Sequence, residues 1–397
     1  MKVLTIHNYH RKGSASGDDQ VFNSEAELLE NHGIKVIKYS VCNDLFDSSG
    51  ILGKIRATCG MLWSFKNYRI VKKIIKEEKP DVVHIHTFFP LLSPSVLYAA
   101  KRSGKNVVAT LHDTRFICPC ATSLRGKKLC NECGDGKYLR MCKYACFKGS
   151  RLQSFIVALI FSYHRLRKSF YNQIDRYICL NDNQINLLVD IGFDYNKIVK
   201  KYNFVPDKYR SINEKKHDEL PKRYVVFYGR IGKEKGVSEL MEIWNEISDI
   251  PLVVMGRGPL ESEFSAWSKK KKNVYFLGYI QHEECLSIVE NCEFVVFPSI
   301  WYEGCSMVEI ETESLGKGLV ATDLGFSSEA IEDGYNGYKV KLGDTKRFVH
   351  LIRKLWDDKE KCKEIGRNAR NDYEKKYRPE DNFSQLLKVY ESLEEKT

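Results

Sequence analysis

Short apolar runs alternate along the chain with segments in which apolar residues recur every three or four positions. The runs have the length of buried strands, and the segments between them, such as 21–31 and 70–78, have the period of amphipathic helices. Alternating strands and helices predict parallel sheets with helices on both faces. The expected strands are residues 3–7, 36–39, 82–86, 107–112, 177–180, 224–228, 252–255, 274–277, 294–297 and 320–322.

The runs fall into two series, which predicts two domains. A chain of 397 residues is long for one hydrophobic core and sufficient for two. Residues 1–205 and 223–378 each carry one series, and the polar, charged stretch 206–222 is the expected linker. Residues 379–397 begin at a break, Arg378–Pro379, and have the pattern of a final helix.

The composition is that of an ordinary folded protein, with 43% apolar and 29% charged residues. The chain starts without a basic leader, and its longest apolar run, 155–161, is too short to span a bilayer. Thirteen cysteines in such a chain indicate thiols or metal ligands in a reducing compartment. We therefore expect a cytoplasmic protein.

The positive charge is concentrated in one part of the chain. The net charge is +11, and residues 101–170 hold 15 Lys and Arg against three acids, which gives that stretch +12. Such a region can face nucleic acid, an anionic membrane surface or a phosphate-bearing acceptor. A solvated surface is the plainer alternative.

The stretch 294–323 reads as strand, loop, helix and strand. An apolar run ends at Pro298, Ser306 can cap a helix that runs to about Leu315, and glycines then release the chain into the next run. Glu303 precedes this helix, where the positive end of the helix dipole favours an anion such as phosphate. Within the helix Glu309 and Glu313 share one face and Glu311 lies on the other. The alternative is a helix whose acids are solvated.

Polar residues and glycines stand where expected strands of the first domain end, which is the ligand-binding edge of a doubly wound sheet. Gly17 lies in the loop 7–19, between a strand and a helix, where its backbone N–H can approach a phosphate. His84, His86 and His112 close two other strands, and a structural role is the alternative for each of them.

The second domain has comparable strand ends. Gly229 leads into a turn that offers Arg230 and Lys235, and two fixed cations can neutralise a departing diphosphate as a metal does elsewhere. The chain has no Asp-x-Asp pair, which agrees with a reaction that needs no metal cofactor. Glycine turns follow two further strands, at Gly256, Gly258 and Gly278.

Seven residues separate Glu303 from Glu311. This pair and the strand-end motifs together resemble the signature of glycosyltransferase family 4. The resemblance covers essentially the whole chain and implies the GT-B fold, two Rossmann-like doubly wound parallel-sheet domains facing a central cleft. It implies an N-terminal acceptor domain, a C-terminal donor domain and a last helix that crosses back to the first domain.

The resemblance also implies roles for individual residues. Glu303 and His112 would contact the transferred sugar, Arg230 and Lys235 would hold the diphosphate, and Glu311 would bind the ribose hydroxyls. The other donor-site residues that it implies are Gly17, Gly229, Gly256, Gly258, Gly278, Gly304, Ser306, Met307 and Val308.

Four segments look like a bacterial branch of this family that is found among polysaccharide enzymes. They are residues 88–95, 112–119 and 146–151 and the Cys-x-x-Cys pair at 130–133. The cysteines of this branch correspond to Cys118, Cys130, Cys133 and Cys146 in the loop 118–146. Four thiolates can hold a tetrahedral structural zinc ion, with Cys120 and Cys142 as substitutes. Plain buried thiols are the alternative.

Residues 154–168 form an apolar stretch with a basic end, which can rest on an anionic membrane or be a buried helix of the first domain. The expected activity is retaining, metal-independent transfer of a sugar from a nucleotide-sugar donor to a saccharide or lipid-linked acceptor in polysaccharide biosynthesis. We expect this in the cytoplasm, with peripheral contact at the inner face of the membrane. A GT-B nucleotide-sugar epimerase or hydrolase is the alternative, and a nucleic-acid-binding module is the third.

Overall fold

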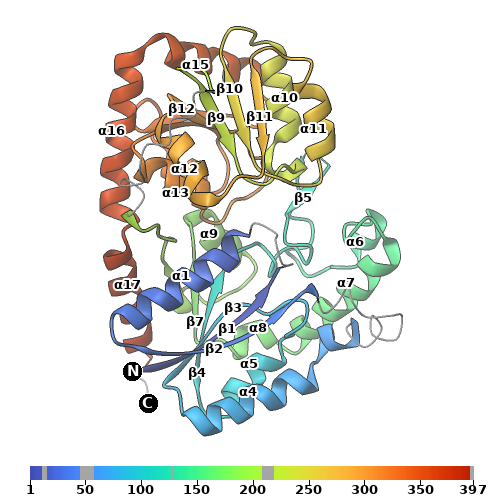
Figure 1. The fold of residues 1–397 in the computed structure, drawn as a ribbon. Coiled ribbons are helices and arrows are strands. Elements are labelled where there is room, and N and C mark those ends of the chain that lie inside the picture. Colours follow the sequence, from blue (N-terminus) through green and yellow to red (C-terminus); the bar gives the residue numbers. More distant parts are fainter. Residues whose placement is uncertain (11–15, 45–57, 127, 208–218, 394–397) are drawn as a thin grey trace. The chain divides into compact units, whose positions relative to one another are not determined.

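The computed structural model describes residues 1–10, 16–44, 58–126, 128–207 and 219–393, which fold as two units (Figure 1). The first unit comprises Met1–Tyr202 and Asn382–Thr397, and the second comprises Asn203–Asp381. Most of the expected linker, residues 208–218, lies outside the described residues, as does the 11–15 part of the loop that precedes Gly17.

The first unit is built on one six-stranded parallel sheet with the order β2-β1-β3-β4-β7-β8. Its strands are β1 (Lys2–Tyr9), β2 (Lys35–Cys42), β3 (Val82–Thr87), β4 (Asn106–Leu111), β7 (Arg176–Cys179) and β8 (Ile198–Lys200). A separate antiparallel hairpin joins β5 (Leu124–Arg125) to β6 (Lys128–Leu129).

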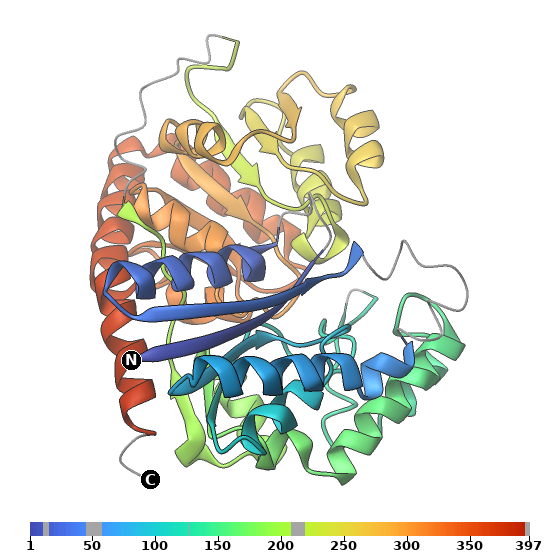
Figure 2. The same ribbon diagram turned by 60° about the horizontal axis from the view of Figure 1, so that its bottom comes forward.

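The helices of the first unit cover both faces of this sheet, with α1 on one face and α4 and α5 on the other (Figure 2). They are α1 (Gly17–Asn31), α4 (Phe65–Glu78), α5 (Ser95–Lys101), α6 (Arg140–Lys143), α7 (Arg151–Leu166), α8 (Ser169–Asn172), α9 (Asp182–Asp190) and the 3-10 turn η1 (Tyr195–Lys197). The last helix, α17 (Pro379–Glu391), runs from the second unit back into the first.

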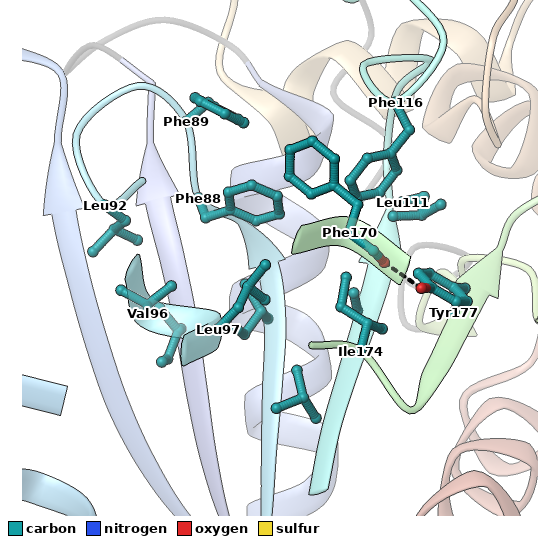
Figure 3. Close-up of a cluster of buried hydrophobic side chains, with 14 of the residues drawn as sticks. Phe88, Phe89, Leu92, Val96, Leu97, Leu111, Phe116, Phe170, Ile174 and Tyr177 are labelled. Carbon is teal, nitrogen blue, oxygen red and sulfur yellow. Dashed lines mark hydrogen bonds between the residues drawn. The ribbon is translucent and has the colours of Figure 1, made fainter. Parts of the chain in front are cut away.

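The face of the first sheet that α5 covers holds a core of aliphatic and aromatic side chains (Figure 3). The rings of Phe88, Phe116 and Phe170 lie within 6.2 Å of one another, centroid to centroid. The hydroxyl of Tyr177 donates a hydrogen bond to the carbonyl of Phe170, so this buried phenol has a partner.

The alternation of side chains along each strand sends polar groups to the opposite face. Leu4 and Ile6 of β1 and Val83 and Ile85 of β3 belong to the apolar core. The residues between and after them are polar and buried, and they face α1; they are Thr5, His7, His84 and His86. The strand period alone therefore gathers histidines under α1.

The second unit has a second six-stranded parallel sheet, with the order β11-β10-β9-β12-β13-β14. Its strands are β9 (Val225–Tyr228), β10 (Leu252–Met255), β11 (Val274–Gly278), β12 (Phe294–Phe297), β13 (Gly318–Thr322) and β14 (Gly337–Val340). Its helical elements are η3 (Lys233–Lys235), α10 (Val237–Asn245), α11 (Glu261–Ser268), α12 (His282–Glu290), α13 (Met307–Ser314), α14 (Phe326–Ala330), α15 (Thr345–Asp357) and α16 (Lys359–Lys376).

The apolar runs predict the strands well. Every expected strand is present and the two parallel sheets are confirmed. The sequence reading did not predict β8, β14 and the β5–β6 hairpin. The first two are short edge strands and the hairpin has two residues a side, so none of them carries a long apolar run. Among the described residues, no helix is both long and apolar enough to cross a membrane.

Candidate active site

Each sheet has a point at which the strand order reverses. The reversal lies between β1 and β3 in the first unit and between β9 and β12 in the second. In open parallel sheets, ligands bind outside the carboxyl ends of the strands at such points. The loops that leave these four strands carry most of the residues singled out in the sequence.

In the second unit, Lys235 and Glu303 form an ion pair beside the ends of β9 and β12. The lysine Nζ lies 2.7 Å from Glu303 Oε1, and the side chains are 19% and 7% exposed. Ser299 Oγ donates a second hydrogen bond of 2.8 Å to the same oxygen. The rings of Phe297 and Trp301 lie 5.5 and 5.8 Å from the lysine nitrogen. The cation is therefore held in place and is largely shielded from water.

Arg230 follows β9 and is more exposed. Its Nε lies 3.2 Å from Glu234 Oε1, and 53% of its side chain is accessible. The turns after β9 and β10 need glycines. A Cβ on Gly256, whose own backbone φ is +141°, would lie 1.8 Å from the carbonyl oxygen of Gly229. A Cβ on Gly258 would likewise lie 2.4 Å from the Ile231 carbonyl oxygen, whereas nothing lies within 4 Å of a Cβ on Gly278.

Helix α13 begins at Met307, immediately after the loop that carries Glu303 and Gly304. Ser306 occupies the N-cap position as predicted, but its side chain makes no capping hydrogen bond. The amides of Ser306, Met307 and Val308 thus stand at the positive end of the helix. Glu311, 4% exposed, lies 3.2 Å from His282 Nε2 at the start of α12.

The other acids of α13 are buried, so the alternative of a helix with solvated acids is wrong. Burial, and then the neighbouring Glu303, raise the pKa of Glu309 to about 8. Its Oε1 accepts a 3.0 Å hydrogen bond from Ser327 Oγ. Burial, and then Glu309, raise the pKa of Glu313 well above its usual range, and its carboxyl oxygens have no hydrogen-bond partner among the described residues.

In the first unit, His112 lies just beyond β4 and its Nε2 is 3.1 Å from Nδ1 of His86 on β3. Both residues line a small cavity of about 30 Å³, which Thr87, Asp113 and Arg115 also line. Burial and the adjacent His86 lower the pKa of His112 to about 4, although Asp18 opposes this shift. His112 is therefore neutral at neutral pH.

Behind His86 lies a fully buried ion pair. Glu25 of α1 accepts a 3.0 Å hydrogen bond from Lys201 Nζ, and Lys201 also contacts Asn382 of α17 at 2.9 Å. Glu25 Oε1 lies 3.2 Å from His84 Nδ1 and 3.1 Å from His86 Nε2. These three residues are close enough to share a metal ion, but the lysine ammonium already supplies the positive charge at the carboxylate.

The start of α1 is acidic. Gly17 is the first residue of this helix, and Asp18 and Asp19 fill its first turn. Asp19 accepts hydrogen bonds from His7 Nε2, at 2.8 Å, and from the backbone N–H of His10. Burial opposes ionisation of Asp18, but His112 and His10 together lower its pKa. A phosphate approaching Gly17 would therefore meet two carboxylates.

The four cysteines of the expected zinc site gather around the β5–β6 hairpin. Burial, followed by the neighbouring Cys118, Cys146 and Cys130, raises the pKa of Cys133 to about 12. Among the described residues, however, no three of these sulfur atoms converge closely enough to share one ion. The donor type and neighbourhood suit zinc, so a structural zinc stays a prediction that metal analysis of the purified protein tests.

Sequence reasoning missed several polar partners of the site. Ser299 and His282 lie beside predicted site residues, but single polar residues in loops or at helix starts give no signal of their own. Glu25 and Lys201 are 176 positions apart in the chain. An acid among the core-facing positions of α1 was the one available sign of a buried charge.

Comparison with known proteins agrees with this geometry. The family model Glycosyltransferase Family 4 matches residues 50–209, and the model Glycosyl transferases group 1 matches residues 209–372. An uncharacterized 41.2 kDa protein in the cps region of Klebsiella pneumoniae is 23% identical over 342 residues, 82% of this chain and 82% of that protein. O-antigen chain mannosyltransferase C of Escherichia coli is 26% identical over 174 residues, 43% of this chain and 47% of that protein.

The solved structures show the same fold. The structure of HepE from Anabaena in complex with UDP covers 99% of this chain and 100% of that chain, with a TM-score of 0.68 at 16% identity. Two adjoining family models, two parallel-sheet units and the GT-B neighbours point the same way. The chain therefore carries the two domains that these family models describe, and it is a glycosyltransferase with the GT-B fold.

Proposed function

We propose that the protein is a retaining, metal-independent glycosyltransferase that moves a sugar from a nucleoside-diphosphate sugar to a saccharide or lipid-linked saccharide acceptor of a cell-surface polysaccharide. The observation that carries the proposal is the desolvated Lys235–Glu303 pair at the reversal point of the second sheet. Support for the donor class comes from the HepE complex with UDP. Support for the product comes from the relatives named for the cps region and the O-antigen chain.

In this proposal the two cations act where a metal acts in other transferases. Lys235 and Arg230 neutralise the charge that develops on the departing diphosphate. Each is paired with a glutamate, so the diphosphate takes over cations that are already held at the site. Glu303, freed from part of that contact, and His112 of the first unit contact the transferred sugar, and Glu311 binds the ribose. Retention rests on the family resemblance alone.

Lys235→Ala and Arg230→Ala are each expected to lower turnover about 100-fold or more, the scale of removing one preorganised electrostatic contact. The assay supplies UDP-, GDP-, ADP- and CDP-sugars with and without EDTA, and NMR of the product gives the anomeric configuration. Lys233→Ala is the matched control, because Lys233 lies in the same turn and is exposed.

Three results would contradict the proposal. Near-normal rates in both variants would remove the cations from the diphosphate site. Loss of wild-type activity in EDTA that Mg²⁺ restores would exclude a metal-independent reaction, and an inverted product would exclude retention. Consumption of the donor without an acceptor would indicate an epimerase or hydrolase instead.

We also propose that the first unit rests on an anionic membrane surface at the cytoplasmic face, where nucleotide sugars are available. The buried-helix alternative for residues 154–168 is only half right. One face of α7 is buried, whereas its other face carries an exposed apolar stripe with basic residues at both ends, Arg151 and Arg167. The stripe comprises Leu152, Phe155, Leu159, Tyr163 and Leu166, which are 69, 45, 49, 45 and 85% exposed.

Leu159→Glu is expected to weaken binding to vesicles that contain phosphatidylglycerol by about tenfold, because it removes one buried leucine and adds a repelled charge. Flotation measures the bound fraction. Val189→Glu, at an exposed apolar position of α9, is the control and should float like the wild type. Equal flotation of the two variants would place the membrane contact elsewhere.

A further inference from the structure

A line of polar groups runs beneath His112 from the end of β4, across β3, to α1. His112 Nε2 lies 3.1 Å from His86 Nδ1, and His86 Nε2 lies 3.1 Å from Glu25 Oε1. Lys201 closes the line at the other carboxylate oxygen, 3.0 Å away. His86 and Glu25 are buried, and neither belongs to the donor-site residues discussed above.

The charge at the far end of this line decides where the protons lie. Burial opposes ionisation of Glu25, but Lys201, followed by His86 and His84, lowers the pKa of Glu25 well below its usual range. Glu25 is therefore a carboxylate, and a carboxylate accepts hydrogen bonds without donating them. His86 Nε2 and Glu25 Oε1 make no hydrogen bond of good geometry to any described group, and the two atoms lie 3.1 Å apart.

The proton positions then follow in sequence. A bare nitrogen lone pair at His86 Nε2 would be repelled by the carboxylate, so a singly protonated His86 ring carries its hydrogen on Nε2. His86 Nδ1 is then an acceptor, and the hydrogen in the contact with His112 must come from His112 Nε2. Because His112 is neutral, its remaining nitrogen, Nδ1, has a lone pair and no hydrogen.

We propose that Glu25 and His86 are positioning residues that hold His112 as the Nε2–H tautomer, so that His112 Nδ1 accepts a hydrogen bond from a hydroxyl of the transferred sugar. The proposal rests on the proposed function, in which His112 contacts that sugar. It also defines the ligand, since the group that meets His112 must donate a hydrogen. A hydroxyl satisfies this requirement and a sugar carboxylate does not.

His84 stands beside this line but does not take part in it. Its Nδ1 lies 2.8 Å from the Tyr390 hydroxyl and its Nε2 lies 2.8 Å from Thr110 Oγ1. Both nitrogens thus have closer partners than Glu25, at 3.2 Å. His84 therefore serves to keep the tail of α17 on the sheet, which leaves the Glu25–His86 contact to set the tautomer.

NMR of protein with ¹⁵N-labelled histidine reads the tautomer directly at pH 7. The His112 signals are assigned with His112→Gln. The expected result is a protonated Nε2 and an unprotonated Nδ1 in both His112 and His86. A protonated Nδ1 in His112, or a doubly protonated ring, would overturn the proposal.

Two substitutions of His86 separate positioning from packing. His86→Asn can keep an acceptor oxygen near the place of Nδ1, so His112 should stay in one tautomer and kcat/KM should stay within about threefold. His86→Leu removes the acceptor; His112 should then show both tautomers, and kcat/KM should fall about tenfold, equivalent to one hydrogen bond. Equal loss in both variants with an unchanged His112 spectrum would mean a structural role only.

The experiments distinguish failure of the proposed function from failure of the proposed proton arrangement. If the wild type transfers no sugar, the proposed function fails, while the NMR spectrum still reports the tautomer. If the wild type transfers sugar but His112 carries its hydrogen on Nδ1, the proton arrangement is wrong and the function stands.

Discussion

Lys201→Met is expected to lower the free energy of unfolding of the first unit by about 3–5 kcal/mol, the usual cost of removing one partner from a buried ion pair. The substitution keeps the length and apolar stem of the side chain but leaves the carboxylate of Glu25 buried without its cation. It also removes the contact with Asn382. Urea unfolding at pH 7 measures the effect, since Glu25 of the wild type is ionised there in both the folded and the unfolded chain.

The adjacent residue provides a matched control for this prediction. Lys200 pairs with Asp182 at the surface, with side chains 33% and 59% exposed, so Lys200→Met should cost less than about 1 kcal/mol. The double variant Glu25→Gln, Lys201→Met removes both charges and should recover part of the loss. Equal effects of the two methionine substitutions would mean that the buried pair does not determine the stability of this unit.

Glu309→Gln is expected to raise the free energy of unfolding of the second unit by about 3 kcal/mol at pH 7. The folded-state pKa of Glu309, about 8, lies above its ordinary value of 4.5. Between these values the unfolded chain releases a proton that the folded chain keeps, so the stability of the wild type falls as pH rises through this window. Glutamine has no proton to lose and still accepts the hydrogen bond from Ser327.

The pH dependence separates this mechanism from simple repacking. The difference between Glu309→Gln and the wild type should be small near pH 4, grow with pH and level off above about pH 8. Glu263→Gln, at an exposed position of α11, is the control and should change stability by less than about 0.5 kcal/mol at any pH. Parallel stability curves for the wild type and Glu309→Gln would contradict the prediction.

Much of the fold could be predicted because parallel strands buried on both faces leave a strong signal. Runs such as Leu252–Met255 and Phe294–Phe297 are apolar, regularly spaced and separated by helical patterns. The β8 and β14 strands lie at sheet edges, and β14 includes Gly337 and Lys339, so their pairing is decided by neighbours and not by their own residues. Ser306 was correctly predicted as the N-cap residue. Its side chain makes no capping hydrogen bond, because such a bond depends on a side-chain rotamer that the sequence does not give.

The site was predictable where local motifs carry it and not where distant segments meet. Arg230, Lys235 and Glu303 stand at strand ends that the hydrophobic periodicity locates. The ion pairs of Arg230 with Glu234 and of Lys235 with Glu303 are a property of the fold. The burial of Glu309 and Glu313 could not be foreseen, since two acids four residues apart on a helix are usually solvated. Their environment comes from α14 and α16, which follow them in the chain.

The return of α17 to the first unit affects the order in which the protein can fold on the ribosome. Asn382 and Tyr390 complete the hydrogen bonding of Lys201 and His84, but they are synthesised after all of the second unit. At about 5–20 residues per second, the nascent first unit waits roughly ten to forty seconds for these contacts. During that interval the polar groups under α1 depend on water. A fragment that ends at Tyr202 would remain in this unfinished state, so the N-terminal half is a poor choice for separate expression.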